Sequence, residues 1–173
     1  MIELLPLQSQ YCEVVARIAK ESLPEYWSLE GIRDVLRYDN NIYYVACDLA
    51  VSDYEEYSEK KVSGNRLELE KEKTDLSGKV IGFAGIMLVA DEAELLNIAV
   101  TGTFRGRGIG QKLLTKMLSE ASRRGVQRML LEVRKSNEPA ISLYHKNGFV
   151  ELGERKNYYS NPEEDAVIME RKL

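Results

Sequence analysis

The spacing of apolar side chains changes along the first fifty residues. Residues 2–5 form a short apolar stretch that ends at a proline, which indicates a strand. Residues 12–19 place apolar side chains three and four apart, the spacing of an amphipathic helix. Ser28 is a suitable N-cap for a second helix through residues 32–36, and residues 41–50 are rich in strand formers. This part of the chain predicts the order strand, helix, helix, strand.

From residue 80 onward, strand-like and helix-like spacings alternate. The strongest signal is a helix in which apolar residues recur every four positions before a glycine, Gly125, stops it. The predicted elements are strands 80–90 and 92–100, a helix over 109–124, a strand over 127–135, a helix between Asn137 and Gly148, and strands 149–159 and 165–173. This order predicts an α/β fold in which helices cover both faces of a mixed sheet.

Residues 51–79 interrupt the pattern with a segment dense in Glu and Lys. Such a composition cannot form a core. Because strand sequence resumes at once, we expect a hairpin of residues 41–50 and 80–90 whose tip carries this charged insertion. A solvated loop without further function explains the segment, and contact with a basic partner is the alternative. The chain length fits one domain over residues 1–173.

Composition narrows the class of protein. A net charge of −4 does not provide the basic face that nucleic-acid binding needs. Cys12 and Cys47 have apolar neighbours and no C-x-x-C spacing, which predicts core thiols in a reducing compartment. One histidine, His145, cannot form a histidine zinc set, so we expect it at the surface and expect no metal. Without a membrane-length apolar run or a signal-peptide pattern, we expect a cytoplasmic protein.

Three glycines stand at alternate positions between a predicted strand and a predicted helix. They let a ligand approach the backbone closely, and the N–H groups at the start of the helix suit a phosphate. The dinucleotide pattern G-x-G-x-x-G is excluded, because Gln111 takes the place of its third glycine, and no P-loop Gly-Lys-Ser/Thr occurs. The pattern is R-x-x-G-x-G, Arg105 to Gly110, which predicts a phosphate-binding turn or simply the end of a strand.

Glu132 is unusual because it lies among apolar residues in a predicted strand. A carboxylate there needs a cation, solvent in a cleft or a shifted pKa. We expect either an ion pair, with a sheet neighbour such as Arg134 or with a helix lysine, or a functional group. Tyr144 lies on the predicted helix that follows this strand. That helix begins at Asn137. If strand and glycine turn are neighbours, these side chains provide a proton acceptor and a proton donor beside a phosphate site.

Two segments resemble the central motifs of the GNAT acetyltransferases: FRGRGIGQKLL, residues 104–114, and LEVRKSNEPAISLYHKNGF, residues 131–149. The similarity extends from about Val80 to the last residue. Within that family the chain most resembles the bacterial ribosomal-protein-alanine N-acetyltransferases, also through DEAELLNIAV and RKNYYSNPEEDAVIM. The resemblance implies a GNAT-type, mostly antiparallel sheet that is splayed at the cofactor site. It further implies acetyl-CoA-dependent acetylation of the N-terminal α-amine of a ribosomal protein, without a covalent enzyme intermediate.

The resemblance also implies roles for individual residues. Glu132 is the general base, directly or through water, and Tyr144 protonates the departing CoA thiolate. The implied contacts to acetyl-CoA come from Ile98, Ala99, Val100, Arg105, Gly106, Arg107, Gly108, Ile109, Gly110, Gln111 and Asn137. No metal is implied.

We expect aromatic side chains to grip the first residues of a peptide, Trp27 on one side and Tyr158 and Tyr159 on the other. A small first residue and a basic continuation should be preferred. The segment Tyr26-Trp27-Ser28 departs from the Pro-Trp-Ser usual in these enzymes, so this wall can differ in shape.

Other functions remain open from the sequence. A lysine side chain or a small amine could be the acceptor. A dinucleotide-binding domain would share the strand, turn and helix, but the glycine register opposes it. A non-catalytic CoA-binding module would not need both Glu132 and Tyr144.

Overall fold

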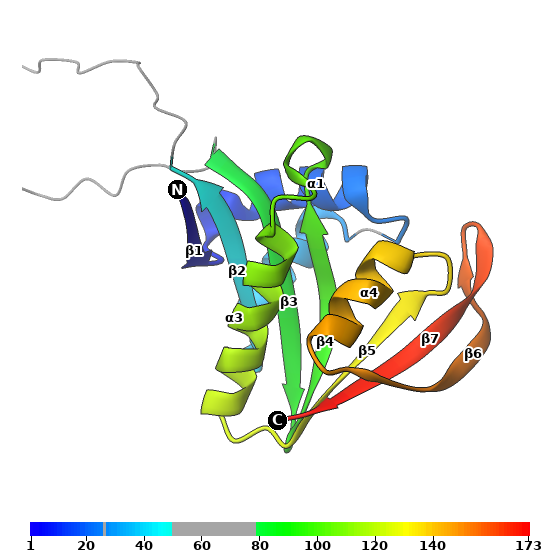
Figure 1. Ribbon diagram of the computed structural model, residues 1–173. Helices are drawn as coiled ribbons and strands as arrows, with labels where there is room; N and C mark the ends of the chain where they lie inside the picture. Colours follow the sequence, from blue (N-terminus) through cyan, green and yellow to red (C-terminus); the bar gives the residue numbers. More distant parts are fainter. Residues whose placement is uncertain (26, 50–78) are drawn as a thin grey trace, which may run out of the picture.

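The computed structural model describes residues 1–25, 27–49 and 79–173. They build a seven-stranded sheet in the order β1-β2-β3-β4-β5-β7-β6, with helices on both faces (Figure 1). All neighbouring strands are antiparallel except β4 and β5. The strands are β1 (Ile2–Pro6), β2 (Asn41–Asp48), β3 (Val80–Val89), β4 (Glu92–Val100), β5 (Arg128–Arg134), β6 (Val150–Ser160) and β7 (Glu163–Lys172). The helices are α1 (Cys12–Ser22), α2 (Leu29–Asp34), α3 (Ile109–Arg123) and α4 (Glu138–Lys146), with the 3₁₀ turns η1 (Ser9–Tyr11), η2 (Val35–Arg37) and η4 (Gly102–Phe104). The predicted α/β class and element order are confirmed.

Capping residues set the helix boundaries. The Ser28 hydroxyl accepts a hydrogen bond from the Gly31 N–H at 3.1 Å and caps α2, as predicted. The Asn137 side chain caps α4 by accepting from the Ala140 N–H at 3.3 Å. The second predicted helix extends further than α2. Its last turn is the 3₁₀ turn η2, in which each hydrogen bond spans three residues instead of four.

Strands β2 and β3 form the predicted antiparallel hairpin, with residue pairs running from Asn41–Met87 to Cys47–Val80. The charged insertion expected at its tip lies outside the described residues, apart from Lys79. The prediction of one domain over residues 1–173 includes that segment and stays a prediction.

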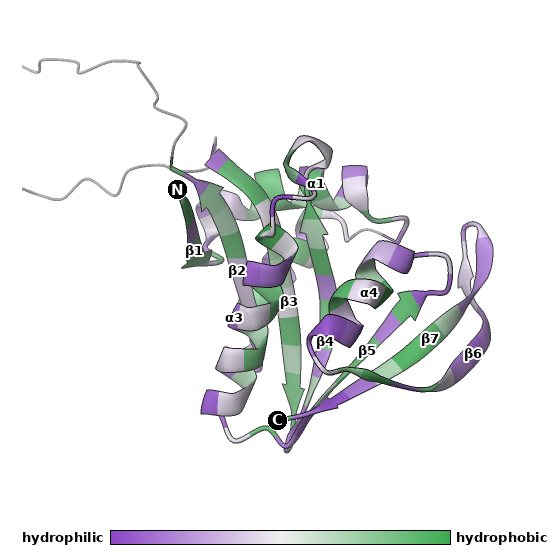
Figure 2. Cartoon of the chain, in the orientation of Figure 1, coloured by the Kyte–Doolittle hydropathy of each residue, from purple (hydrophilic) through white to green (hydrophobic). Residues whose placement is uncertain are grey.

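Two apolar clusters hold the layers together. On one face, Leu113 and Met117 of α3 and Tyr144 of α4 cover sheet residues that include Leu131 of β5. On the other face, α1 and α2 pack on β2 and β3 around Phe83. Figure 2 shows the apolar colouring along the strands and on the inner sides of the helices. Burial of these side chains is the main stabilising contribution to the fold.

The sheet opens in its middle. The parallel pairing of β4 with β5 extends only from Glu92–Arg128 to Leu95–Leu131. At the same level the register of β4 against β3 shifts, so that Leu96 is an extra residue in the ladder. Beyond it, β4 stays with β3 while β5 stays with β7, and the two strands diverge (Figure 1). The expected splayed sheet is confirmed.

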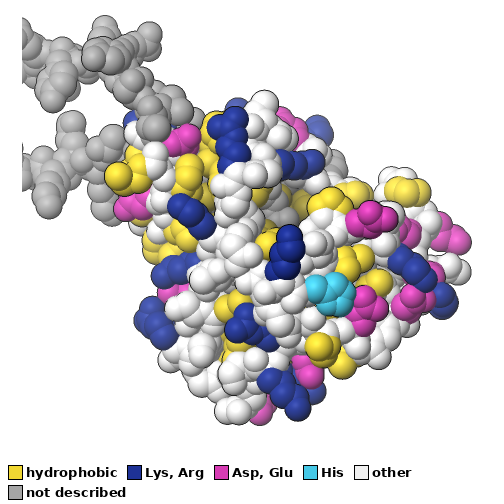
Figure 3. Space-filling view, in the orientation of Figure 1, with side chains coloured by type: hydrophobic (Ala, Val, Ile, Leu, Met, Phe, Trp, Pro, Cys, Tyr) yellow, Lys and Arg dark blue, Asp and Glu magenta, His cyan; other side chains and the backbone are white. Residues whose placement is uncertain are grey.

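The expected surface and core residues also lie as predicted. Cys12 and Cys47 are buried and form no disulfide, and burial raises the pKa of the Cys47 thiol to about 11. His145 is exposed, with its Nε2 3.1 Å from a Glu151 carboxylate oxygen, and Figure 3 shows acidic and basic side chains interspersed on this face. None of the helices in the described ranges is long and apolar enough to cross a membrane.

Candidate active site

The glycine turn connects η4 to α3 with unusual backbone angles. Gly106 and Gly108 have φ values of +74° and +77°, which side chains rarely adopt. A Cβ at either position would meet nothing within 4 Å, so the glycines are required by backbone conformation and leave open space in front of the turn. A Cβ on Gly110 would only touch Leu143, at 3.6 Å.

The amides at the start of α3 are available to a ligand. Gly108 immediately precedes the helix, and its carbonyl accepts the first backbone bond, from the Lys112 N–H at 3.1 Å. The N–H groups of residues 109–111 come before this first bond, so the helix contains no backbone acceptor for them. They lie at the positive end of the helix dipole. An exposed turn with free amides fits the pyrophosphate of a coenzyme.

The two arginines of the turn have separate contacts. The Arg105 Nε donates to the Val100 carbonyl at 3.0 Å and so fixes the end of β4. The Arg107 guanidinium lies 4.9 Å from the centre of the Phe104 ring. Both side chains remain exposed, so they can add charge to a site that the backbone forms.

The splayed end of β4 faces the gap in the sheet. Ile98 and Val100 are partly buried against the α3 and α4 cluster, while Ala99 belongs to the opposite cluster. Past Leu95 this strand has no ladder partner in β5. Its free edge can therefore offer backbone groups to a bound chain such as pantetheine.

Glu132 is the first residue of β5 beyond the last pair with β4. Its side chain is 17% exposed and its Oε1 lies 2.6 Å from Arg155 Nη1 on β6. The pKa of the Tyr158 hydroxyl is raised, mainly by a hydrogen bond with the Glu132 carboxylate and to a smaller extent by burial. The expected ion pair with a sheet neighbour is confirmed, but its cation is Arg155 and not the example Arg134 or a helix lysine. The sheet order places β6 near β5 across β7, so Arg155 reaches the carboxylate, which local spacing does not reveal.

Glu132 lines a pocket of about 390 Å³. The other side chains around it come from β4, β5, β6 and β7 and from the end of β3, and they include Glu94, Leu130, Arg155, Tyr158 and Ile168. The neighbouring β5 residues Leu131 and Val133 belong to the core under α3 and α4. Because side chains alternate along a strand, Glu132 points to the opposite face of the sheet.

Tyr144 lies on the α4 side of that core. It is 5% exposed and its ring packs 5.7 Å from that of Phe149. Burial, assisted by the proximity of Tyr159, raises the pKa of its hydroxyl. The structure thus does not bring Glu132 and Tyr144 together on one face. It places them on the two faces of β5, beside the gap that separates this strand from β4.

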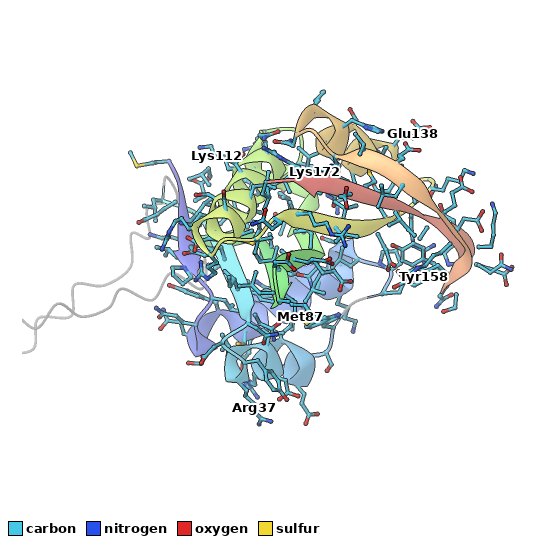
Figure 4. The ribbon with its side chains drawn as sticks, turned by 90° about the horizontal axis from the view of Figure 1, so that it is seen from below. Arg37, Met87, Lys112, Glu138, Tyr158 and Lys172 are labelled. Carbon is cyan, nitrogen blue, oxygen red and sulfur yellow. The ribbon has the colours of Figure 1, made fainter. Side chains whose placement is uncertain are left out.

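Of the three aromatic residues expected to grip a peptide, Tyr158 lines the pocket. Tyr158 is 46% exposed near the end of β6 (Figure 4), and its ring meets Tyr159 edge-on at 5.0 Å. Trp27 is partly buried, with its ring centre 6.3 Å from that of Tyr43. Tyr26, the residue at which this segment departs from the usual Pro-Trp-Ser, lies outside the described residues.

Sequence reasoning missed Arg155 and did not find the partners of Arg134. Arg155 is paired with Glu132, and Arg134 is buried among groups of the β6–β7 hairpin. A lone carboxylate in an apolar strand signals that a cation is near, but only the strand order shows which one. The described residues contain no group of three or more His, Cys, Asp and Glu side chains able to hold a metal ion.

The model of the acetyltransferase (GNAT) family matches residues 13–149, which is most of the chain. This chain belongs to the GNAT acetyltransferase family. The [ribosomal protein bS18]-alanine N-acetyltransferase of Haemophilus influenzae is 47% identical over 96 residues, covering 54% of this chain and 65% of that protein. Its namesake in Salmonella typhimurium is 43% identical over 116 residues, covering 65% and 78%. The match therefore spans just under two thirds of the first of these GNAT relatives.

Solved structures agree with the family. The ribosomal-protein-S18-alanine N-acetyltransferase of Escherichia coli superposes with a TM-score of 0.77 at 27% identity, covering 100% of this chain and 94% of that one. Arabidopsis thaliana NAA60 in complex with acetyl-CoA gives a TM-score of 0.79 at 18% identity, covering 100% and 99%, which shows the shared fold.

Proposed function

We propose that this GNAT chain transfers the acetyl group of acetyl-CoA to the N-terminal α-amine of a protein. The substrate we propose is a ribosomal protein that begins with alanine. The observation that carries the proposal is the position of Glu132, directly beyond the point where β4 and β5 part, in a pocket on the face opposite Tyr144. The names of the relatives that match this chain over 96 and 116 residues support the choice of acceptor.

The residues around the gap fit acetyl-CoA. The turn residues Arg105, Gly106, Arg107, Gly108, Ile109, Gly110 and Gln111 would hold the pyrophosphate, chiefly through backbone N–H groups. The free edge at Ile98, Ala99 and Val100 would hold the pantetheine and direct one amide at the thioester oxygen. Asn137 uses its side-chain oxygen to cap α4, which leaves its NH₂ group for the coenzyme.

Glu132 is suited to accept the proton of the amine. An α-ammonium group, with a pKa near 8, must lose a proton before its nitrogen can attack a carbonyl carbon. Arg155 and Tyr158 occupy part of the hydrogen-bonding capacity of the carboxylate. A carboxylate offers about four lone-pair positions, so capacity remains for the substrate nitrogen or a bridging water.

Tyr144 is suited to protonate the leaving group. The new C–N bond forms as the thioester C–S bond breaks, and the electron pair departs on sulfur. Because burial raises the pKa of Tyr144, its hydroxyl keeps a proton to donate to that thiolate. The enzyme then needs no covalent intermediate, since amine and thioester meet directly in the gap.

A peptide chain would lie on the pocket face, between Trp27 and the pair Tyr158 and Tyr159. The net charge of −4 favours a basic continuation after the first residue. A ribosomal substrate implies action in the cytoplasm and needs no direct contact with nucleic acid or membrane. Acetylation of a lysine or a small amine is the alternative.

A matched pair of peptides tests this function. One begins with a free alanine and contains no lysine. The other has the same sequence with a blocked first residue and one internal lysine. We expect acetylation of the first peptide only, measured by mass spectrometry after incubation with acetyl-CoA. Acetylation of the second peptide alone would replace the proposal by the lysine alternative.

A further inference from the structure

Arg134 ends β5 two residues after Glu132 and therefore points to the same face of the sheet. It is 9% exposed, which is rare for an arginine without a dense set of partners. A guanidinium buried to this extent needs acceptors from the surrounding chain.

The guanidinium binds the turn between β6 and β7. Arg134 Nη1 donates to the Pro162 carbonyl and to a Glu164 carboxylate oxygen, both at 3.0 Å. Its Nη2 donates to the Asn161 carbonyl at 3.1 Å. The Arg134 guanidinium also lies over the Tyr159 ring, and its central carbon is 4.3 Å from the ring centre. Four contacts thus fix the hairpin that carries both tyrosines.

The same side chain reaches the segment between α1 and α2. Arg134 Nη2 is paired with the Glu25 carboxylate, two residues before Trp27. Within the described ranges, this pair is the only hydrogen bond or ion pair joining residues 23–28 to β5, β6 or β7. One guanidinium therefore links the two sides of the proposed peptide site.

We infer that Arg134 is a positioning residue for the peptide: it sets the spacing between the Trp27 segment and the Tyr158–Tyr159 hairpin. The inference rests on the proposed function. A planar guanidinium with five N–H donors in a fixed fork can serve both sides at once. A lysine keeps the charge but donates from a single nitrogen, so it cannot hold both sides in the same geometry. The two walls would then move independently and a peptide would have to order them on binding.

The variant Arg134→Lys tests this inference, with Arg128→Lys as the matched control. Arg128 lies at the other end of β5 and also bridges two carboxylates, those of Glu92 and Glu170. For Arg134→Lys we expect the peptide KM to rise about 10-fold or more, while kcat and the Kd for acetyl-CoA change less than about 3-fold, as for lost uniform binding. Arg128→Lys should leave the peptide KM within about 2-fold of the wild-type value.

Hydrogen exchange provides a readout that does not depend on activity. In Arg134→Lys, backbone amides in residues 23–25 and 158–164 should both exchange faster, while those of α3 stay unchanged. Glu25→Gln removes only one side of the link and should speed exchange near Trp27 and raise the peptide KM. This variant tests the inference if Arg134→Lys does not fold.

Two results would overturn the inference: unchanged exchange in both segments, or a rise in peptide KM no larger than that of Arg128→Lys. A wild-type enzyme that does not acetylate the alanine peptide, with faster exchange in both segments of the variant, would count against the proposed function and not against the link.

Discussion

At the scale of single residues, Glu132 has the central role in the proposed reaction, as the proton acceptor. Replacing it by Gln keeps its shape but removes the proton acceptor. We expect kcat to fall about 100-fold or more, with the Kd for acetyl-CoA little changed. Glu170→Gln is the control, because Glu170 is also a sheet carboxylate paired with an arginine, Arg128, but lies outside the pocket. Equal activity of the two variants would show that Glu132 only balances charge.

Tyr144 can be tested through pH as well as by substitution. Since burial raises its pKa above the ordinary value near 10, the acid stays protonated as pH rises, and kcat should show no alkaline decline up to about pH 10. Tyr144→Phe keeps the packing but should lower kcat by about 100-fold. The loss should shrink with a thioester whose leaving thiol is more acidic.

The control for this substitution is Tyr11→Phe. It removes the hydroxyl of a buried tyrosine in η1, which is distant in sequence from Tyr144. If Tyr144→Phe loses the same activity with both thioesters, Tyr144 serves packing and another group is the acid.

At the scale of elements, the glycine turn and α3 form the proposed coenzyme site. Gly108→Val should weaken acetyl-CoA binding at least about 100-fold by calorimetry, about 2.7 kcal/mol, since the side chain enters the space in front of the amides. Gly125→Val is the matched control, because Gly125 follows the same helix with φ +75° and equally open surroundings. Both variants carry similar backbone strain. Loss of binding in both, or in neither, would contradict the assignment of this turn.

The elements were largely predictable, because their signals are local. Apolar spacing identified α1 and α3, and the caps Ser28 and Asn137 marked helix starts. The splayed pairing of β4 and β5 followed only from family resemblance, since it arises at Leu96 from the register of β4 against β3. No local pattern around Leu96 predicts such a shift.

At the scale of the whole molecule, the site is more divided than its sequence suggests. Motif spacing indicated that Glu132 and Tyr144 belong to one site, but not that they lie on opposite faces of β5. The roles of Arg155 and Arg134 depend on strand order, which places β6 and β7 beside β5. Sequence therefore identified the proposed catalytic groups, whereas the residues that surround them required the tertiary arrangement.

This division gives the gap in the sheet its proposed use: coenzyme and peptide approach from opposite faces and meet where β4 and β5 part. The most direct measurement is a crystal structure with a bisubstrate analogue, in which CoA is joined through an acetyl group to the N-terminal alanine of a peptide. We expect the pyrophosphate on the amides of residues 106–111. The alanine nitrogen should lie within about 3.2 Å of the Glu132 carboxylate or one water away, and the sulfur beside the Tyr144 hydroxyl. An analogue bound outside the gap, or with its nitrogen turned away from Glu132, would contradict the account.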